Sequence, residues 1–117
     1  MFEDIKLTKE ANYLICILYK EYLERRQCGV PREDAGTFRG SKYIHNEFLS
    51  EWQYKDVVAA CQELDEVGLL RCYCSDSNVL RIKFESRGIA YMESSFQRNI
   101  SSVIDCLTNI KKLISLF

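Results

Sequence analysis

The sequence predicts an α+β domain that is mainly helical and is organised around residues 53–84. The first part of this stretch has apolar residues at intervals of three and four, which places them on one face of a helix of about four turns. These residues are Tyr54, Val57, Val58, Cys61, Leu64 and Val67. Gly68 follows, and helices often end at glycine because it has no β-carbon to oppose a left-handed conformation. Residues 69–74 and 79–84 then alternate around a polar turn, which predicts a two-stranded hairpin.

The composition is typical of a globular protein with one domain. Hydrophobic residues make up 47% of the 117 residues, which is enough apolar side chain for a core. The formal net charge is −1, so no strong and indiscriminate attraction to nucleic acid or to an anionic membrane is expected. Any binding of nucleic acid must therefore come from how the charges are distributed. No apolar run approaches the length that spans a bilayer, so no membrane partner is expected.

Six cysteines raise the question of disulfides or a metal site. Residues 1–9 are charged and contain no apolar run, so we expect no secretory signal, a cytoplasmic location and reduced thiols. Cys16, Cys61 and Cys106 fall on apolar helix faces, where a thiol behaves as a small hydrophobic side chain. Cys72 and Cys74 have no second cysteine pair at the spacing of zinc ligands. We therefore expect no metal and no cofactor.

The first element in chain order is a helix from about residue 9 to residue 26. Thr8 is a suitable N-cap, and Glu10 lies where a carboxylate interacts favourably with the helix dipole. The apolar residues recur at intervals of three and four, which predicts one buried stripe. The stripe comprises Ala11, Leu14, Ile15, Leu18 and Tyr22, and Ile17 widens it.

Residues 27–40 form the longest stretch without periodicity, because three glycines and a proline interrupt it. Five basic residues lie in or beside this stretch. They are Arg25, Arg26, Arg32, Arg39 and Lys42. The stretch is either an ordinary solvated loop or a basic flap beside a face that binds nucleic acid, and both interpretations stay open.

A short second helix is expected from residue 42 to about residue 51, with Ser41 as its N-cap. Its inward side chains would be Ile44, Phe48 and Leu49. Trp52 follows in the turn and is expected to fill the angle between this helix and the next. His45 is the only histidine, and no residue near it in sequence completes a catalytic triad. Together with the lack of a glycine-rich phosphate loop and of a His-Glu-x-x-His helix, this predicts that the chain is not an enzyme.

The predicted hairpin has two unlike faces, because successive residues of a strand point to opposite sides of the sheet. The apolar face would meet the helices and comprises Leu70, Cys72, Cys74, Leu80, Ile82 and Phe84. The other face would display Arg71, Tyr73, Arg81 and Lys83. Three cations with one aromatic ring suit contact with phosphates, although outward strand residues in many proteins are of these types.

After the hairpin, Glu85 or Ser86 can cap another helix, and Gly88 in its first turn would let the backbone lie close to the hairpin. From residue 96 to residue 117 the apolar residues are spaced alternately by four and three, a heptad pattern over about 30 Å of helix. We expect this helix to pack on a domain of residues 1–95.

The heptad stripe also predicts a homodimer. Its interface would comprise Phe96, Ile100, Val103, Leu107, Ile110 and Ile114, with Phe117 at the end. Ile104 and Leu113 make the apolar arc wider than one partner helix needs. The alternative is that the stripe packs only on the first helix of the same chain.

Two segments carry a resemblance to a known fold. Residues 57–70, with the sequence VVAACQELDEVGLL, look like the recognition helix and first wing strand of winged helix-turn-helix proteins. Residues 84–92, FESRGIAYM, resemble the junction Leu-Thr-x-Lys-Gly-x-x-Tyr-Leu of small bacterial and phage proteins of the YjcQ-like and PadR-like groups. The chain departs from that pattern at Glu85, at Ser86 and in the long segment 27–40. The resemblance implies a winged helix-turn-helix with a long C-terminal helix and a role as a DNA-binding transcriptional regulator.

In that fold the start of the third helix enters the major groove of double-stranded DNA. The residues expected to contact bases are Gln53, Lys55 and Asp56, with Tyr54 on the groove rim. Gln53 and Lys55 suit adenine and guanine edges. The residues expected to meet phosphates are Ser41 and Lys42 on the second helix and Arg71, Arg81 and Lys83 on the hairpin, with Tyr73 among them.

Four acidic residues on the central helix oppose this interpretation. They are Asp56, Glu63, Asp65 and Glu66, against the single cation Lys55. The last three could point away from DNA, but Asp56 lies in the first turn. The alternative hypothesis is therefore a winged-helix interaction module that binds a protein partner without contacting DNA.

Overall fold

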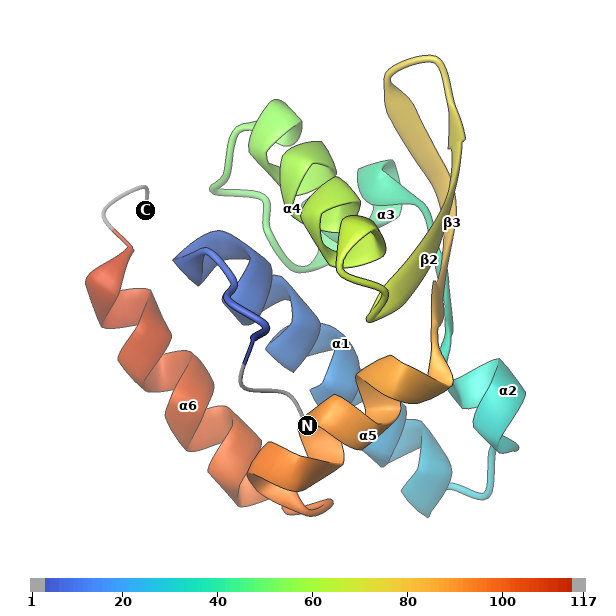
Figure 1. Ribbon diagram of the computed structural model, residues 1–117, viewed down its shortest axis with the longest axis vertical. Helices are drawn as coiled ribbons and strands as arrows, with labels where there is room; N and C mark the ends of the chain where they lie inside the picture. Colours follow the sequence, from blue (N-terminus) through green and yellow to red (C-terminus); the bar gives the residue numbers. More distant parts are fainter. Residues whose placement is uncertain (1–3, 115–117) are drawn as a thin grey trace.

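The structure is a computed structural model that describes residues 4–114 (Figure 1). Its helices are α1 (Lys9–Gln27), α2 (Arg32–Ala35), α3 (Ser41–Glu47), α4 (Tyr54–Glu66), α5 (Ser86–Phe96) and α6 (Ile100–Leu113). Its strands are β1 (Thr37–Arg39), β2 (Leu70–Ser75) and β3 (Asn78–Phe84). The mainly helical α+β class is confirmed. None of the helices described is long and apolar enough to cross a membrane.

The three strands form one antiparallel sheet in the order β1-β3-β2. The sequence predicted the β2–β3 hairpin, but the expectation that residues 27–40 are irregular throughout is wrong. They contain α2 and β1, and β1 pairs with β3 through Phe38 opposite Ile82. A strand of three residues shows only one alternation, which is too short to be recognised among glycines.

A bulge in the hairpin changes which side chains face outward. Tyr73 pairs with Arg81 and Cys74 pairs with Val79, so Leu80 is an extra residue on β3. Val79 is buried, whereas Leu80 is 60% exposed. The prediction that Leu80 lies on the inner face is therefore wrong, because strict alternation fails at a bulge.

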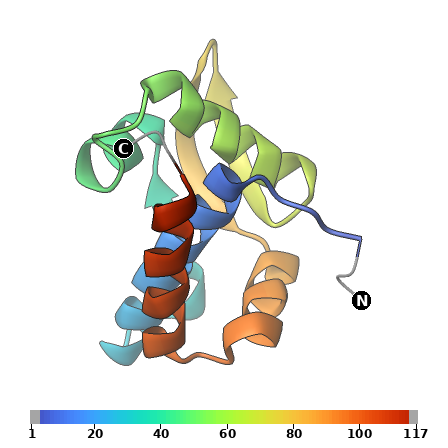
Figure 2. The ribbon, with the colours of Figure 1, turned by 90° about the vertical axis from the view of Figure 1, so that its left-hand side faces the viewer.

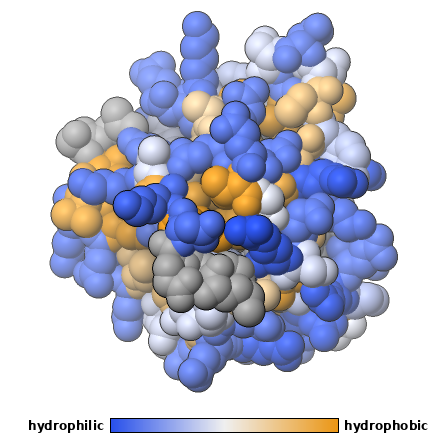
Figure 3. Space-filling model, viewed as in Figure 1, coloured by the Kyte–Doolittle hydropathy of each residue, from blue (hydrophilic) through white to orange (hydrophobic). Residues whose placement is uncertain are grey.

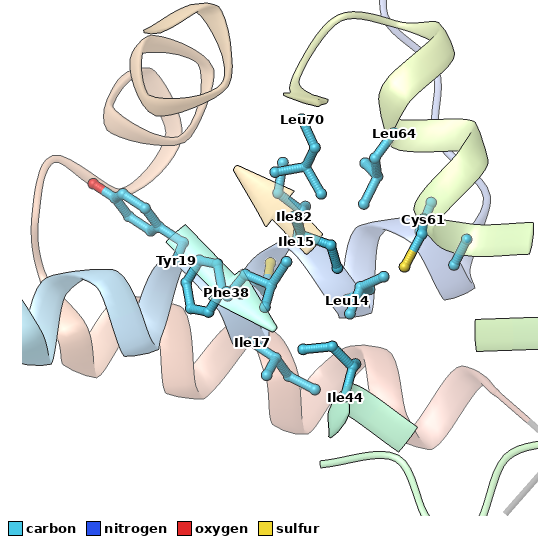
Figure 4. Packing of buried hydrophobic residues seen from close by; sticks show 14 of the residues in the cluster. Leu14, Ile15, Ile17, Tyr19, Phe38, Ile44, Cys61, Leu64, Leu70 and Ile82 are labelled. Atoms are coloured by element: carbon cyan, nitrogen blue, oxygen red, sulfur yellow. The ribbon is translucent and has the colours of Figure 1, made fainter. Parts of the chain in front are cut away.

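Helix α1 is the centre of the core. Six consecutive residues from Leu14 to Tyr19 are buried, so α1 is covered on all sides rather than along one stripe. The sheet and α4 lie on one side of it, while α5 and α6 lie on the other (Figures 1 and 2). Side chains from the sheet and from α4 meet those of α1 in this core, with Leu70, Ile82 and Leu64 beside Leu14 and Ile15 (Figure 4).

Helix α3 is shorter than predicted, ending at Glu47, and Gly40 rather than Ser41 is its N-cap. A β-carbon at Gly40 would collide with the carbonyl oxygen of Val79, so glycine is needed where this segment crosses β3. Trp52 is buried and its ring stacks on Tyr13 of α1 at 6.1 Å between centroids. Its predicted packing role is confirmed.

Helix α4 ends as predicted at a glycine in the left-handed region, Gly68 with φ of 80°. The helix expected from residue 96 to 117 begins later than predicted, at Ile100, and residues 115–117 lie outside those described. α5 ends at Phe96, Gln97 and Arg98 have φ of 60° and 109°, and Asn99 caps α6 by accepting a hydrogen bond from the Ser102 N–H at 3.2 Å. The asparagine cap starts a new helix, although the apolar spacing continues across the break.

Helix α6 lies along α1 (Figure 2). Val103, Ile110 and Ile114 of the predicted dimer stripe are buried in the core of their own chain. The other three stripe residues, Phe96, Ile100 and Leu107, are half-buried against the same core. The stripe is therefore packed within the monomer; Phe117 lies outside the described residues.

The exposed apolar residues of α6 do not form a second stripe. Ile104 is 42% exposed and Leu113 is 62% exposed. They are nine residues apart, and at about 100° per residue they lie on opposite flanks of the helix. The surface in the view of Figure 3 is mainly hydrophilic, and its apolar side chains gather in patches, one of them along the α6 side at the left. The homodimer stays a prediction.

Candidate nucleic-acid interface

The start of α4 is open to solvent. Gln53 is the N-cap residue but its side chain makes no capping hydrogen bond, and both Gln53 and Lys55 are exposed. Val57 and Val58 on the next positions are buried and hold the helix on the core. The structure therefore leaves Gln53 and Lys55 open to a ligand, whereas Asp56, the third residue predicted to contact bases, is half-buried.

Tyr54 ties this helix end to the hairpin. Its hydroxyl donates a hydrogen bond of 2.6 Å to Oδ1 of Asn78 and lies 2.7 Å from Oγ of Ser41. The Ser41 Oγ also accepts a hydrogen bond from the Val79 N–H at 3.1 Å. One small network thus joins α3, α4 and the first residues of β3.

Two predicted contact residues are occupied by this network. Ser41 is completely buried, so its hydroxyl is not available to a phosphate, and that prediction is wrong. Tyr54 is half-buried with its hydroxyl bonded, so it positions the hairpin rather than presenting a free hydroxyl at a groove rim. Lys42, the neighbour of Ser41, is exposed in the first turn of α3.

The outer face of the sheet carries a cluster of cations that we call the basic sheet face. It comprises Arg39 of β1, Arg81 and Lys83 of β3, and Arg71 and Tyr73 of β2. These side chains face outward because their strand neighbours Phe38 and Ile82 are buried in the core. Arg39 was missing from the predicted site, since only the pairing of β1 with β3 brings it to the hairpin.

Carboxylates neutralise one part of the basic sheet face. Glu33 of α2 pairs with Lys83 at 2.8 Å, and Glu85 pairs with Arg71 at 3.5 Å. The hydrogen bond from Lys83 holds the pKa of Glu33 below its usual value, and Glu33 in turn raises the pKa of Lys83. These pairs are exposed, so each contributes little to stability.

The other two arginines of the basic sheet face, Arg39 and Arg81, lie over aromatic rings. The guanidinium of Arg81 lies over the ring of Tyr73 at 4.4 Å, and that of Arg39 lies over the ring of Tyr43 at 5.4 Å. Hydrogen bonds from Arg71 and then Arg81 lower the pKa of the Tyr73 hydroxyl. In the part of the chain that is described, no carboxylate forms an ion pair with Arg39 or Arg81.

Three of the four acidic residues of α4 have local contacts, and one of them, Asp65, also contributes to the raised pKa of Arg71 on the basic sheet face. Glu63 accepts hydrogen bonds from the Thr8 N–H at 2.8 Å and from the Thr8 hydroxyl at 2.7 Å, so it anchors the start of α1. Asp65 accepts from the Cys72 N–H at 3.4 Å. Asp56 lines a hollow of about 320 Å³ together with Thr8, Glu63 and Glu10.

Two other hollows are each lined in part by the hairpin. One, of about 250 Å³, is lined by Tyr54, Lys55, Val58 and Ser77. The other, of about 350 Å³, is lined by Arg39, Gly40, Lys42, Tyr43, Asn78, Val79 and Leu80. Ser77 and Asn78 are neighbours in sequence, so the hairpin turn connects the start of α4 with the basic sheet face.

The cysteines form neither a disulfide nor a metal site in the part of the chain that is described. All six are free thiols, and burial raises the pKa of Cys16. The pKa of Cys72 is raised by its hydrogen bond with Cys61 and by burial, so these thiols are poor nucleophiles. Within residues 4–114, no three histidine, cysteine or acidic side chains are grouped so that they could hold a metal ion.

No protein-family model, no curated protein and no solved structure matches the chain. The positions and charges of the residues described above are therefore the observations that bear on what the protein binds.

Proposed function

We propose that this chain is a winged helix-turn-helix protein that binds double-stranded DNA and acts as a transcriptional regulator of bacterial or phage origin in the cytoplasm. The observation that carries the proposal is the hydrogen bond from Tyr54 to Asn78. It fixes the hairpin beside the start of α4, where Gln53 and Lys55 are exposed. A helix end and a basic hairpin held together in this way suit a groove and its flanking phosphates.

The order of the elements supports the winged-helix assignment. α3 and α4 are consecutive helices joined by a short turn, and they supply the two helices of a helix-turn-helix. β2 and β3 follow α4 directly and supply the wing. The sheet order β1-β3-β2 keeps this hairpin beside the helices by adding a third strand to its β3 edge.

In this proposal the contacts divide into two kinds. Gln53 and Lys55 meet base edges in the major groove, where an amide suits adenine and an ammonium suits guanine. Lys42, Arg71, Arg81 and Lys83 meet phosphates, which position the protein without selecting a sequence. No cofactor or metal takes part.

The positions of the acids reduce the main objection to DNA binding. Glu63 points to the start of α1, where it bonds Thr8, and Asp65 bonds the backbone of β2. Asp56 is half-buried in the first turn of α4, where a carboxylate interacts favourably with the helix dipole. Each of these acids therefore has a structural reason to be present.

A second candidate function is the binding of a protein partner without DNA. The observation that favours it is the hollow beside α4, to which Glu10, Asp56 and Glu63 all contribute. Such a surface suits a basic segment of a partner rather than a phosphate backbone.

Fluorescence anisotropy with a labelled duplex of random sequence separates the two candidates. The DNA-binding proposal predicts binding at about 50 mM salt that weakens steeply toward 200 mM, because bound counterions are released from the phosphates. Lys55→Ala should weaken binding, whereas Lys112→Ala on α6 should leave it unchanged. If no duplex is bound at low salt, the DNA proposal fails and the protein-partner candidate replaces it.

A further inference from the structure

We propose that Arg39 and Arg81 form a phosphate clamp on the outer face of the sheet, which grips one backbone phosphate of the bound nucleic acid. The inference rests on the proposed DNA binding and adds a contact outside the hairpin and the helix-turn-helix. It assigns a role to β1, the strand that the sequence did not reveal.

Strand register places the two residues opposite each other. Arg39 of β1 and Arg81 of β3 are direct partners in the antiparallel ladder, so their β-carbons are about 4.5–5.5 Å apart. The preceding pair, Phe38 and Ile82, is buried beneath them. The two side chains therefore leave the outer face from neighbouring positions, and each guanidinium then lies over a ring of its own, Tyr73 for Arg81 and Tyr43 for Arg39.

The same sheet contains a second pair of like charges, which serves as an internal comparison. Arg71 and Lys83 are also direct partners, but each has its own carboxylate, Glu85 at 3.5 Å and Glu33 at 2.8 Å. Like charges that face each other across strands destabilise a sheet. The protein compensates this pair internally and leaves the pair of Arg39 and Arg81 without an acid among the residues described.

The uncompensated pair is also held in place. Arg81 lies over the ring of Tyr73 and Arg39 over the ring of Tyr43. Stacking of this kind engages the flat face of a guanidinium. Arg81 also hydrogen-bonds the Tyr73 hydroxyl, and its remaining N–H groups are the ones that meet an anion. A β-carbon at Gly40 would collide with Val79, so the backbone after Arg39 is fixed against β3. Two arginines that start from paired strand positions and are each held by a ring suit two oxygens of one phosphate.

The surroundings favour a phosphate of a polymer over a free anion. The clamp is on an open face, where two solvated cations bind a single ion weakly. The hollow that Arg39 lines continues to Lys42 and Asn78, and it leads toward the start of α4. Leu80, exposed by the bulge, borders the same hollow and offers an apolar contact to a sugar. A chain of phosphates can follow this path from α4 to the sheet.

The test measures how the logarithm of the duplex binding constant depends on the logarithm of salt concentration. Each phosphate contact contributes about 0.9 to the slope. Since both arginines hold the same phosphate, Arg39→Gln with Arg81→Gln should lower the slope by about 0.9 rather than by twice that amount. Each variant loses some free energy of duplex binding. The sum of the losses in Arg39→Gln and Arg81→Gln should exceed the loss in the double variant, because either change already disrupts the shared contact.

Two variants complete the design. Arg39→Lys keeps the charge but loses the planar pair of donors. The slope of the salt dependence should therefore be unchanged, while the duplex affinity should fall. Lys112→Gln on α6 is the matched control for loss of one positive charge far from the sheet. It should change neither the salt slope nor the duplex affinity. Circular dichroism and melting of each free variant confirm folding; removal of Arg39 relieves repulsion and should not lower the melting temperature.

The outcomes are distinguishable. If the wild type binds duplex and the double glutamine variant has the same slope and affinity, the clamp is refuted while DNA binding stands. If the losses in the single variants simply add, the two residues contact separate phosphates, which also overturns the clamp. If the wild type does not bind duplex at all, the proposed function itself fails.

Discussion

The Tyr54 hydroxyl donates a hydrogen bond of 2.6 Å to Asn78, across 24 positions of sequence. Tyr54 is the first residue of α4 and Asn78 is the first residue of β3, so this contact joins the end of the helix that would enter a groove to the hairpin beside it. Tyr54→Phe removes the donor and leaves a half-buried acceptor. We expect the free energy of unfolding to fall by about 1 kcal/mol in urea titrations.

The control for that variant is Tyr73→Phe. Tyr73 is 38% exposed, so loss of its hydroxyl should change the free energy of unfolding by less than about 0.5 kcal/mol. Tyr54→Phe should also weaken duplex binding more than Tyr73→Phe does. Equal stability of the two variants would show that the bond to Asn78 does not fix the hairpin.

The hairpin cations should matter for affinity and not for sequence preference. Replacing Arg81 and Lys83 by Ala should weaken binding to every duplex and flatten its salt dependence by about one unit of slope per lost phosphate contact. Anisotropy titrations on two unrelated duplexes measure both effects. A loss confined to one duplex sequence would mean that these residues contact bases instead.

Glu33 should compete with DNA for Lys83, because it holds that ammonium at 2.8 Å. Glu33→Gln removes the competing carboxylate and should raise duplex affinity about two- to five-fold at low salt. Asp34→Asn, an exposed acid on the same short helix, is the matched control and should have a smaller effect. A fall in affinity for Glu33→Gln would exclude a role of Lys83 in phosphate contact.

The same ion pair predicts a dependence of stability on pH. Lys83 lowers the pKa of Glu33 in the folded state, so the contribution of the pair is fully present above the ordinary carboxyl pKa of about 4.3. It is lost as the pH falls through the lowered pKa. Glu33→Gln should therefore show a smaller loss of melting temperature than the wild type between pH 5 and pH 3 (about the range in which such carboxyls titrate).

The sequence predicted the elements whose signals are local and repeated. The periodic apolar face of α4, the stop at Gly68 and the hairpin all required only spacing and turn chemistry. The bulge at Leu80 was missed because nothing in the alternation marks an extra residue in a strand. The break between α5 and α6 was missed because the spacing from Phe96 to Ile100 continues through it, while the cap at Asn99 decides the geometry.

The candidate site was predicted in part for similar reasons. Gln53, Lys55, Arg71, Arg81 and Lys83 are exposed or half-exposed as expected. Ser41 is buried because the segment after Gly40 is pressed against β3, and Arg39 joins the face only through pairing of distant strands. Both facts depend on tertiary contacts, which spacing along the chain does not encode.

The buried thiols should be unreactive as long as the protein is folded, and none of the six thiols should be cross-linked. Reducing agent is expected to change neither the melting temperature nor the oligomeric state, because no thiols are cross-linked. Alkylation of the native protein should modify the exposed Cys28 and Cys74 first, and the buried Cys16 and Cys61 only after unfolding. A melting temperature that falls with reductant would reveal a disulfide.

Light scattering tests the predicted homodimer. A regulator with a stable interface is dimeric at about tens of micromolar. A wild type that is monomeric at that concentration refutes the homodimer. Replacing Leu107 and Ile110 by Glu should cost several kcal/mol, but Ile110 is buried in its own chain, so that variant loses stability in either case. Ile104 and Leu113 are exposed, so Ile104→Glu and Leu113→Glu should keep the fold. A loss of dimer in these variants would then report on the interface and not on stability.

The most direct test of the account is a titration of the isotope-labelled protein with a random duplex at low salt, followed by backbone amide chemical shifts. We predict that the largest changes map to Gln53, Lys55 and the strand residues Arg39 and Arg81, and that α6 is unaffected. Changes centred on Glu10 and Glu63, or no changes at all, would contradict the proposal that the start of α4 and the basic sheet face together bind DNA.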